Sequence, residues 1–241
     1  MAEWFENLKS QFILNFVDGA RWKLLLEGLA STLEITLVAV VIGIFLGVIV
    51  AIVRSSYDKN ASSMHGAGKA VLGFFNAIAK IYLTVIRGTP VVVQLLIMYY
   101  IIFQASNNKM LIAIVTFGIN SGAYVAEIFR SGIMSIDSGQ FEAGRAVGLN
   151  YTQTMVHIII PQAFKNVLPA LANEVIVLFK ETSVAGYVAI TDLTRAGNMI
   201  RGVTFSAFMP LIAVALIYLV IVIVLTKLVS LLERRLRSSD H

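Results

Sequence analysis

The stretch ITLVAVVIGIFLGVIVAIV, residues 35–53, is 19 residues long and carries no charge. An α-helix needs about 20 predominantly apolar residues to span the hydrocarbon core of a bilayer, so this stretch is predicted to cross a membrane. A second uncharged stretch covers the 22 residues from 205 to 226. Only 14% of the chain is charged, whereas an average soluble domain has about 25%. The sequence therefore predicts an all-α polytopic membrane protein.

The apolar runs predict five transmembrane helices. They cover residues 24–53, 89–104, 110–129, 168–188 and 207–232. Segment 1–23 is expected to be extracytoplasmic or interfacial, and residues 233–241 form a tail. Gly43 and Gly47 in the first span have the spacing that lets helices approach closely, although this spacing often arises by chance.

Segment 70–86 is apolar enough to be a sixth span, and that alternative stays open. However, polar side chains recur in and around it at helical spacing, which predicts a helix lying at the membrane surface. These residues are Lys69, Asn76, Lys80, Thr84 and Arg87. Thr89 and Pro90 then suit the cap and the first position of the next helix.

Basic residues near the ends of the spans predict the orientation. With five spans, twelve lysines and arginines fall on one side and six on the other. The richer side is expected to be the cytoplasm, which places the N-terminus outside and the C-terminus inside. Glu34, in the first span, has no assigned role.

The polar stretch 137–161 lies on the predicted cytoplasmic side. A short helix is expected after Asp137, with Gly148 as its C-terminal stop. A second helix, from about Tyr151 to Ile160, is expected to end before Pro161. Small side chains on the first helix leave room for a partner to dock, namely Ala143, Gly144 and Ala146. A connecting loop that happens to be helical is the alternative.

Four ordered motifs resemble one family. The residues Glu142, Ala143, Gly144, Gly148, Ile158 and Pro161 resemble the EAA loop of permease subunits of ABC importers. Here Gly144 replaces the second alanine of that motif, and Ile160 replaces a leucine. RGTPVVVQLLIMYY (87–100), INSGAYVAEIFRSGI (119–133) and LFKETS (178–183) resemble the branch that imports polar amino acids.

The resemblance implies a type I ABC importer permease fold in the bacterial cytoplasmic (inner) membrane. Two permease subunits, identical or homologous, would surround a translocation path, and the six EAA-loop residues would couple each subunit to a cytoplasmic ABC ATPase dimer. An extracytoplasmic binding protein would deliver the amino acid. The sequence GAGKA at 66–70 lacks the spacing of a phosphate loop. ATP and Mg are therefore expected on the partner, and this chain is expected to be no enzyme, to bind no cofactor and to bind no nucleic acid.

Polar residues inside the predicted spans are candidates for the substrate path, because such residues usually face the bundle interior or an aqueous path. The candidates are Gln94, Asn120, Tyr124, Glu127, Glu174, Lys180, Thr182 and Ser183. Lys180 suits the α-carboxylate of an amino acid and Glu174 suits a cation, which favours a basic or amide substrate. Alternatively, Glu127 with Arg130, and Glu174 with Lys180, are structural ion pairs.

Other classes of protein fit less well. A secondary transporter driven by an ion gradient is the main alternative, but it would be expected to have duplicated spans or paired broken helices. The chain has no cysteine, and its three histidines are scattered, so neither a metal site nor a catalytic set is expected. The sequence leaves open which amino acid is carried and whether the binding protein is free, lipid-anchored or fused to another chain.

Overall fold

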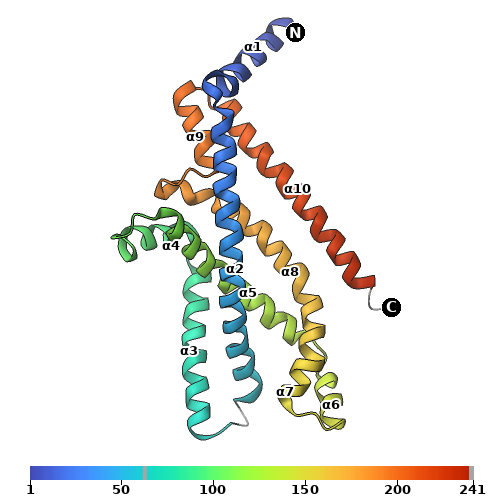
Figure 1. Cartoon of the computed structure of the whole chain (residues 1–241). Helices are drawn as coiled ribbons and strands as arrows, with labels where there is room; N and C mark the ends of the chain where they lie inside the picture. Colours follow the sequence, from blue (N-terminus) through green and yellow to red (C-terminus); the bar gives the residue numbers. More distant parts are fainter. Residues whose placement is uncertain (62–63, 239–241) are drawn as a thin grey trace. The chain divides into compact units, whose positions relative to one another are not determined.

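The computed structural model describes residues 1–61 and 64–238, and the regular elements among them are helical (Figure 1). The N-terminal part contains α1 (Ala2–Phe12), η1 (Ile13–Val17), η2 (Asp18–Ala20), α2 (Trp22–Asn60) and α3 (Gly66–Gly88). The central part contains α4 (Val91–Ile97), η3 (Met98–Ile102), α5 (Lys109–Met134), α6 (Ser138–Ala146), α7 (Tyr151–Thr154) and η4 (Met155–Ile159). The C-terminal part contains α8 (Ile160–Glu181), η5 (Thr182–Val188), α9 (Leu193–Thr204) and α10 (Phe208–Ser238). Residues 239–241 of the predicted tail lie outside the described residues.

Five helical segments are long and apolar enough to cross a membrane, which is the number predicted from the sequence. They are Trp22–Lys59, Gly66–Gly88, Lys109–Met134, Tyr151–Val188 and Phe208–Leu236. The all-α polytopic fold class is therefore confirmed.

The two candidates for the second span, residues 70–86 and 89–104, differ in helix length. Segment 70–86 belongs to α3, a continuous helix of 23 residues, whereas α4 and η3 together hold only 12 residues. Twelve helical residues extend about 18 Å, which is short of the roughly 30 Å of a hydrocarbon core. Part of the polar face of α3 meets protein rather than water, because Asn76 is buried and accepts a hydrogen bond of 2.7 Å from Arg54 on α2.

The helix that begins at Tyr151 does not end before Pro161 as predicted. It runs on as η4 and α8 to Glu181, and Pro161 is the second residue of α8. Proline interrupts a helix by losing an N–H and by crowding the preceding turn. The π-helical turn η4 lies directly before Ile160 and Pro161, and a wider turn at this point relieves that crowding.

The chain divides into two compact units, each of which takes part of the long helices. Unit 1 consists of residues 1–38, 91–117 and 176–227, and unit 2 of residues 39–90, 118–175 and the described part of 228–241. The core of unit 1 joins α9 to the start of α2 and to α10, through Phe16, Leu25, Leu193, Ala196, Ile200 and Val214. Asn15 is buried in the same unit and accepts a hydrogen bond of 2.8 Å from Thr204. The N-terminal segment is therefore anchored at the connection between α9 and α10.

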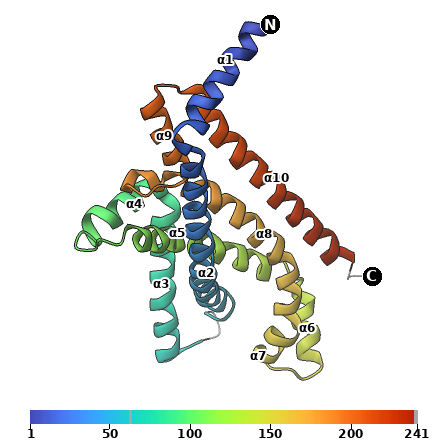
Figure 2. The same ribbon diagram turned by 45° about the horizontal axis from the view of Figure 1, so that its top comes forward.

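Unit 2 is organised around close contacts of α5 with α2 and α3. A Cβ atom on Gly43 would lie 2.9 Å from Oγ of Ser121, and one on Gly47 would collide with Val125. The two glycines therefore let α2 approach α5, the close-packing role considered for their spacing. The hydroxyl of Tyr82 on α3 donates a hydrogen bond of 2.6 Å to the carbonyl of Ile119. In both views α3 runs antiparallel to the second half of α2, and α6 and α7 form a hairpin (Figures 1 and 2).

Candidate functional site

Residues 137–154 form a hairpin with a defined signal at each end of its turn. The side chain of Asp137 caps α6 by accepting a hydrogen bond of 2.7 Å from the backbone N–H of Gly139. Gly148 has φ +83°, the left-handed conformation that glycine adopts most easily. Asn150 and Gln153 then form a capping box at the start of α7, with two hydrogen bonds of 2.9 Å. The predicted helix–turn–helix is therefore confirmed up to this point.

The hairpin buries one side and exposes the other. Gly144 was expected on the docking surface, but it is buried against α7, where a Cβ atom would lie 2.6 Å from Cγ2 of Thr154. The close packing of α6 on α7 requires this. Glu142, Ala143 and Ala146 are exposed, and Val147 is 75% exposed. These four residues are thus part of the surface that is open to a partner.

A small apolar cluster holds the hairpin in unit 2. Ile133, Ile159 and Ala163 are its buried members, with Ile136, Phe141, Met155 and Ile158 packed against them. The ring of Phe141 stacks on that of Tyr151 at 6.3 Å between centroids. Ile158 therefore anchors the hairpin, while Pro161 is exposed just inside α8.

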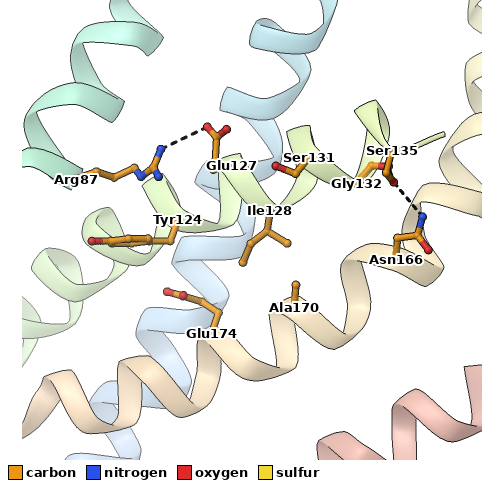
Figure 3. Close-up of a pocket in the computed structure, with 10 residues that line it drawn as sticks. All are labelled: Arg87, Tyr124, Glu127, Ile128, Ser131, Gly132, Ser135, Asn166, Ala170 and Glu174. Carbon is orange, nitrogen blue, oxygen red and sulfur yellow. Dashed lines mark hydrogen bonds and ion pairs between the residues drawn. The ribbon is translucent and has the colours of Figure 1, made fainter. Parts of the chain in front are cut away.

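Unit 2 also contains a cavity of about 580 Å³ between α3, α5 and α8 (Figure 3). Its charged lining residues come from three helices: Arg87 at the end of α3, Glu127 on α5 and Glu174 on α8. Polar and small side chains complete the wall, namely Tyr124, Ile128, Ser131, Gly132, Ser135, Asn166 and Ala170. Its volume is within the range of sites that enclose small molecules.

The two carboxylates of the cavity have different surroundings. Glu127 accepts a hydrogen bond of 3.0 Å from Nε of Arg130, and its other oxygen lies 3.5 Å from Nη1 of Arg87. The Arg87 guanidinium also lies 5.8 Å from the centre of the Tyr124 ring, within the range of a cation–π contact. Glu174 is only 8% exposed and accepts a hydrogen bond of 2.9 Å from the hydroxyl of Ser121. Glu127 is thus paired with two arginines, and the hydroxyl of Ser121 is one of the partners of Glu174.

The cavity brings together three of the eight predicted path residues: Tyr124, Glu127 and Glu174. Asn120 is on α5 with Tyr124 and Glu127, but it is 2% exposed and does not line the cavity. Thr182 is fully buried, and its hydroxyl donates to the carbonyl of Phe179 at 2.8 Å.

The remaining three predicted path residues lie in unit 1. Gln94 is half-buried on α4. Lys180 is exposed, and together with Ser183 it lines a separate hollow of about 280 Å³ beside Thr194 and Tyr218. The predicted pairing of Lys180 with Glu174 in one wall stays a prediction.

Several residues of the cavity were not among the sequence candidates. Arg87 was expected to flank a span on the cytoplasmic side, and Ser131, Ser135 and Asn166 were not considered. Their spacing along the predicted helices could have predicted some of them. Residues 166, 170 and 174 fall on one face of α8, and residues 124, 128 and 131 on one face of α5, with residue 135 continuing this spacing directly after the helix. Arg87 has no such signal, because its contact with Glu127 depends on the packing of α3 against α5.

The described residues contain no group of three histidine, cysteine, aspartate or glutamate side chains that could hold a metal ion. Instead, the cavity presents one guanidinium, two carboxylates and several neutral hydrogen-bonding groups. Such a set is suited to a ligand that carries both a carboxylate and an amino group, because each charge finds an opposite charge in the wall.

Comparisons with known proteins point in one direction. Residues 43–238 match the family described as binding-protein-dependent transport system inner membrane component. The arginine transport system permease protein ArtQ of Bacillus subtilis is 38% identical over 219 residues, covering 90% of this chain and 94% of that protein. The glutamine transport system permease protein GlnP of Escherichia coli is 36% identical over 218 residues, covering 89% and 93%.

Solved structures agree with these matches. The crystal structure of an amino acid ABC transporter with histidines has a TM-score of 0.80 to this chain at 38% identity, covering 91% of this chain and 98% of that chain. The MetNI methionine ABC transporter in an inward-facing conformation has a TM-score of 0.74 at 19% identity, covering 89% and 97%. At 19% identity, the second likeness is evidence for a shared fold only.

Proposed function

This chain belongs to the family of binding-protein-dependent transport system inner membrane components, and we propose that it is the permease subunit of an ATP-driven importer for basic or amide amino acids. It is a multi-pass membrane protein with the type I ABC importer permease fold. Two of its relatives are named for arginine and glutamine, one basic and one amide amino acid.

The exposed face of the α6–α7 hairpin is the proposed contact with a separate ATPase. A cap, a glycine turn and a capping box fix the backbone of this hairpin, yet Glu142, Ala143 and Ala146 are left exposed. This observation supports the proposed contact most directly. A rigid element with an uncovered small-residue face suits docking into a groove on a partner. ATP and Mg would bind to that partner, and hydrolysis would move the hairpin.

The cavity of unit 2 is the proposed part of the translocation path in which an amino acid is held. Arg130 and Arg87 neutralise Glu127, and Glu174 is the second carboxylate in the cavity wall, which is proposed to meet the side-chain head of a basic or amide substrate. Arg87 is the cation within the cavity that can meet an α-carboxylate. A wall with two carboxylates also repels a third, which disfavours acidic substrates.

Unit 1 is proposed to receive the substrate from an extracytoplasmic binding protein. Lys180, Ser183 and Thr194 line one hollow there, and a second hollow of about 450 Å³ shares Ser183 and Thr194 and adds Arg195 and Asp192. Burial raises the pKa of Asp192, although backbone N–H groups of Thr194 and Arg195 donate to it. Two cationic side chains at this entrance suit an incoming carboxylate.

The basic residues near the span ends support the proposed orientation, because they stay more numerous on the cytoplasmic side when α3 replaces residues 89–104 as the second span. The N-terminus lies outside, the α6–α7 hairpin lies in the cytoplasm, and the C-terminus lies inside. A second permease subunit, identical or homologous, completes the path. The membrane would be the bacterial cytoplasmic membrane.

Reconstitution tests the proposal. The permease, its ATPase and its binding protein are placed in vesicles, and uptake is measured with arginine, lysine, histidine, glutamine, asparagine and glutamate. The expected result is ATP-dependent uptake of basic or amide amino acids and exclusion of glutamate. Uptake that continues without the ATPase but collapses with an ion gradient would instead make the chain a secondary transporter.

A further inference from the structure

The last turn of α2 contacts the hairpin and α5 through two consecutive residues of unit 2. The ammonium of Lys59 lies 3.4 Å from the centre of the Phe141 ring on α6. Its neighbour Asp58 lies 3.9 Å from Nη1 of Arg130 on α5. Any movement of α6 that displaces Phe141 therefore acts on the same turn that carries Asp58.

Phe141 is placed to respond to a docked partner. It precedes Glu142 and Ala143, which face outward, while its own ring packs inward on Tyr151 and beneath Lys59. A cation over an aromatic face is a weak contact when it is exposed to water and a stronger one when it is desolvated. The contact between α6 and α2 is thus specific but weak enough to change during a transport cycle.

From Asp58 a series of ion pairs continues to the cavity. The two oxygens of Asp58 lie near Arg54 (3.7 Å) and Arg130 (3.9 Å). The two oxygens of Glu127 contact Arg130 and Arg87, the latter at 3.5 Å. We call these five residues the arginine–carboxylate chain, in which three arginines alternate with two carboxylates.

In the arginine–carboxylate chain the two carboxylates compete for Arg130, because Arg130 contacts both Asp58 and Glu127. If the end of α2 draws Arg130 toward Asp58, Glu127 is left with Arg87 alone and binds it more firmly. If Arg130 stays on Glu127, that carboxylate is already neutralised and holds Arg87 less firmly. Arg87 lines the cavity, so its release provides a free guanidinium for a ligand carboxylate.

We propose that the arginine–carboxylate chain, joined to α6 through Lys59 and Phe141, transmits the position of the hairpin to the cavity by setting how firmly Glu127 holds Arg87. This inference rests on the proposed function, in which the hairpin meets the ATPase and the cavity holds the amino acid. Coupling between sites requires an element with two arrangements that both sites bias. The shared Arg130 is that element.

A double-mutant cycle between the Lys59–Phe141 contact and the arginine–carboxylate chain tests the proposal. Phe141→Leu keeps an apolar side chain in the cluster but removes the ring face, and Asp58→Asn keeps the shape but removes the charge. Lys59→Met should give the same loss as Phe141→Leu. In vesicles holding the full transporter, each single variant is expected to lower the number of amino acids imported per ATP hydrolysed by about twofold to tenfold. Lys69→Met, which removes an exposed lysine from α3, is the matched control and should leave this ratio unchanged.

The double variant Phe141→Leu with Asp58→Asn decides between transmission and packing. These side chains lie at different points of the proposed route, so independent structural roles would give losses that multiply. Transmission along one route predicts that the double variant is no worse than the worse single variant. Multiplying losses, or single variants with an unchanged ratio, would overturn the inference while ATP-dependent uptake by the wild type and by Lys69→Met still supports the proposed function. Absence of ATP-dependent uptake in the wild type would overturn the proposed function itself.

Discussion

The α6–α7 hairpin and the cavity lie in the same unit of the protein, yet they are specified in opposite ways. The hairpin is formed by 18 consecutive residues, 137–154, whose caps and turn are chosen locally. The cavity is lined by residues from positions 87 to 174, and its central ion pair joins α3 to α5. The hairpin leaves exposed the side chains that are proposed to meet the ATPase, whereas the cavity pairs Arg87 with Glu127 in its wall.

This difference sets what each region tolerates. In the hairpin a single backbone conformation, that of Gly148, fixes the direction of the chain, so a change there is expected to act through geometry. In the cavity the charged residues come from three helices and line the space for a ligand, so a change there is expected to act through selectivity.

The largest effect is expected in a test of which side of the membrane Arg87 faces. The answer decides whether α3 or residues 89–104 cross the membrane. If α3 crosses, a cysteine introduced as Gly88→Cys should react with an impermeant reagent from outside. Gly88 is exposed, and its Cβ position has nothing within 4 Å, so the substitution should not disturb packing. Gln153→Cys should react only from inside and Asn198→Cys only from outside. Labelling of Gly88→Cys from the cytoplasm would restore the span at 89–104.

Gly148→Leu tests the geometry of the hairpin. A side chain in the left-handed conformation costs about 1–2 kcal/mol, so leucine should straighten the turn. It should not collide with a neighbour, because a Cβ atom on Gly148 would have no other side chain or distant backbone atom within 4 Å. Substrate-stimulated ATP hydrolysis is expected to fall by about tenfold. Gly148→Asn is the control, because asparagine adopts this conformation more readily than leucine, and it should retain most of the activity. Equal activity of the two variants would show that the turn does not position the docking surface.

Glu174→Gln tests the charge of the cavity. The amide keeps an acceptor for Ser121 but removes the negative charge, so the ratio of arginine to glutamine uptake should fall by about tenfold. Lys180→Met, in the hollow of unit 1, should instead reduce the uptake of every amino acid, because all substrates share the α-carboxylate. An unchanged ratio in the first variant and unchanged uptake in the second would give both residues a purely structural role.

Gly144→Ala tests the buried side of the hairpin and has the smallest expected effect. The new Cβ would lie 2.6 Å from Cγ2 of Thr154, and overpacking of this kind costs about 1–3 kcal/mol. A gain in helix propensity of up to about 1 kcal/mol opposes this cost. The net loss should lower the thermal unfolding temperature by a few degrees. Adding Thr154→Ala removes the collision and should restore it, whereas continued loss in the double variant would contradict the packing described.

Local patterns predicted the hairpin well because its signals act over a few residues. Asp137, Gly148, and the Asn150 and Gln153 pair each satisfy a backbone group within three positions of themselves or fix one turn. The burial of Gly144 escaped prediction, since it depends on Thr154 across the turn. The end of the second helix at Pro161 was wrong because the π-helical turn before it was not visible in the pattern.

The sequence by itself determined the class of the protein, the number of spans, the hairpin and the family. Long uncharged runs require a bilayer and short capping motifs close their own hydrogen bonds, so neither depends on distant partners. Only the tertiary structure decided that α3 is long enough to be a span, that part of its polar face meets Arg54, and that Arg87 reaches Glu127. The physical reason is that a polar residue in an apolar helix has the same pattern whether water or another helix satisfies it. Packing alone distinguishes the two.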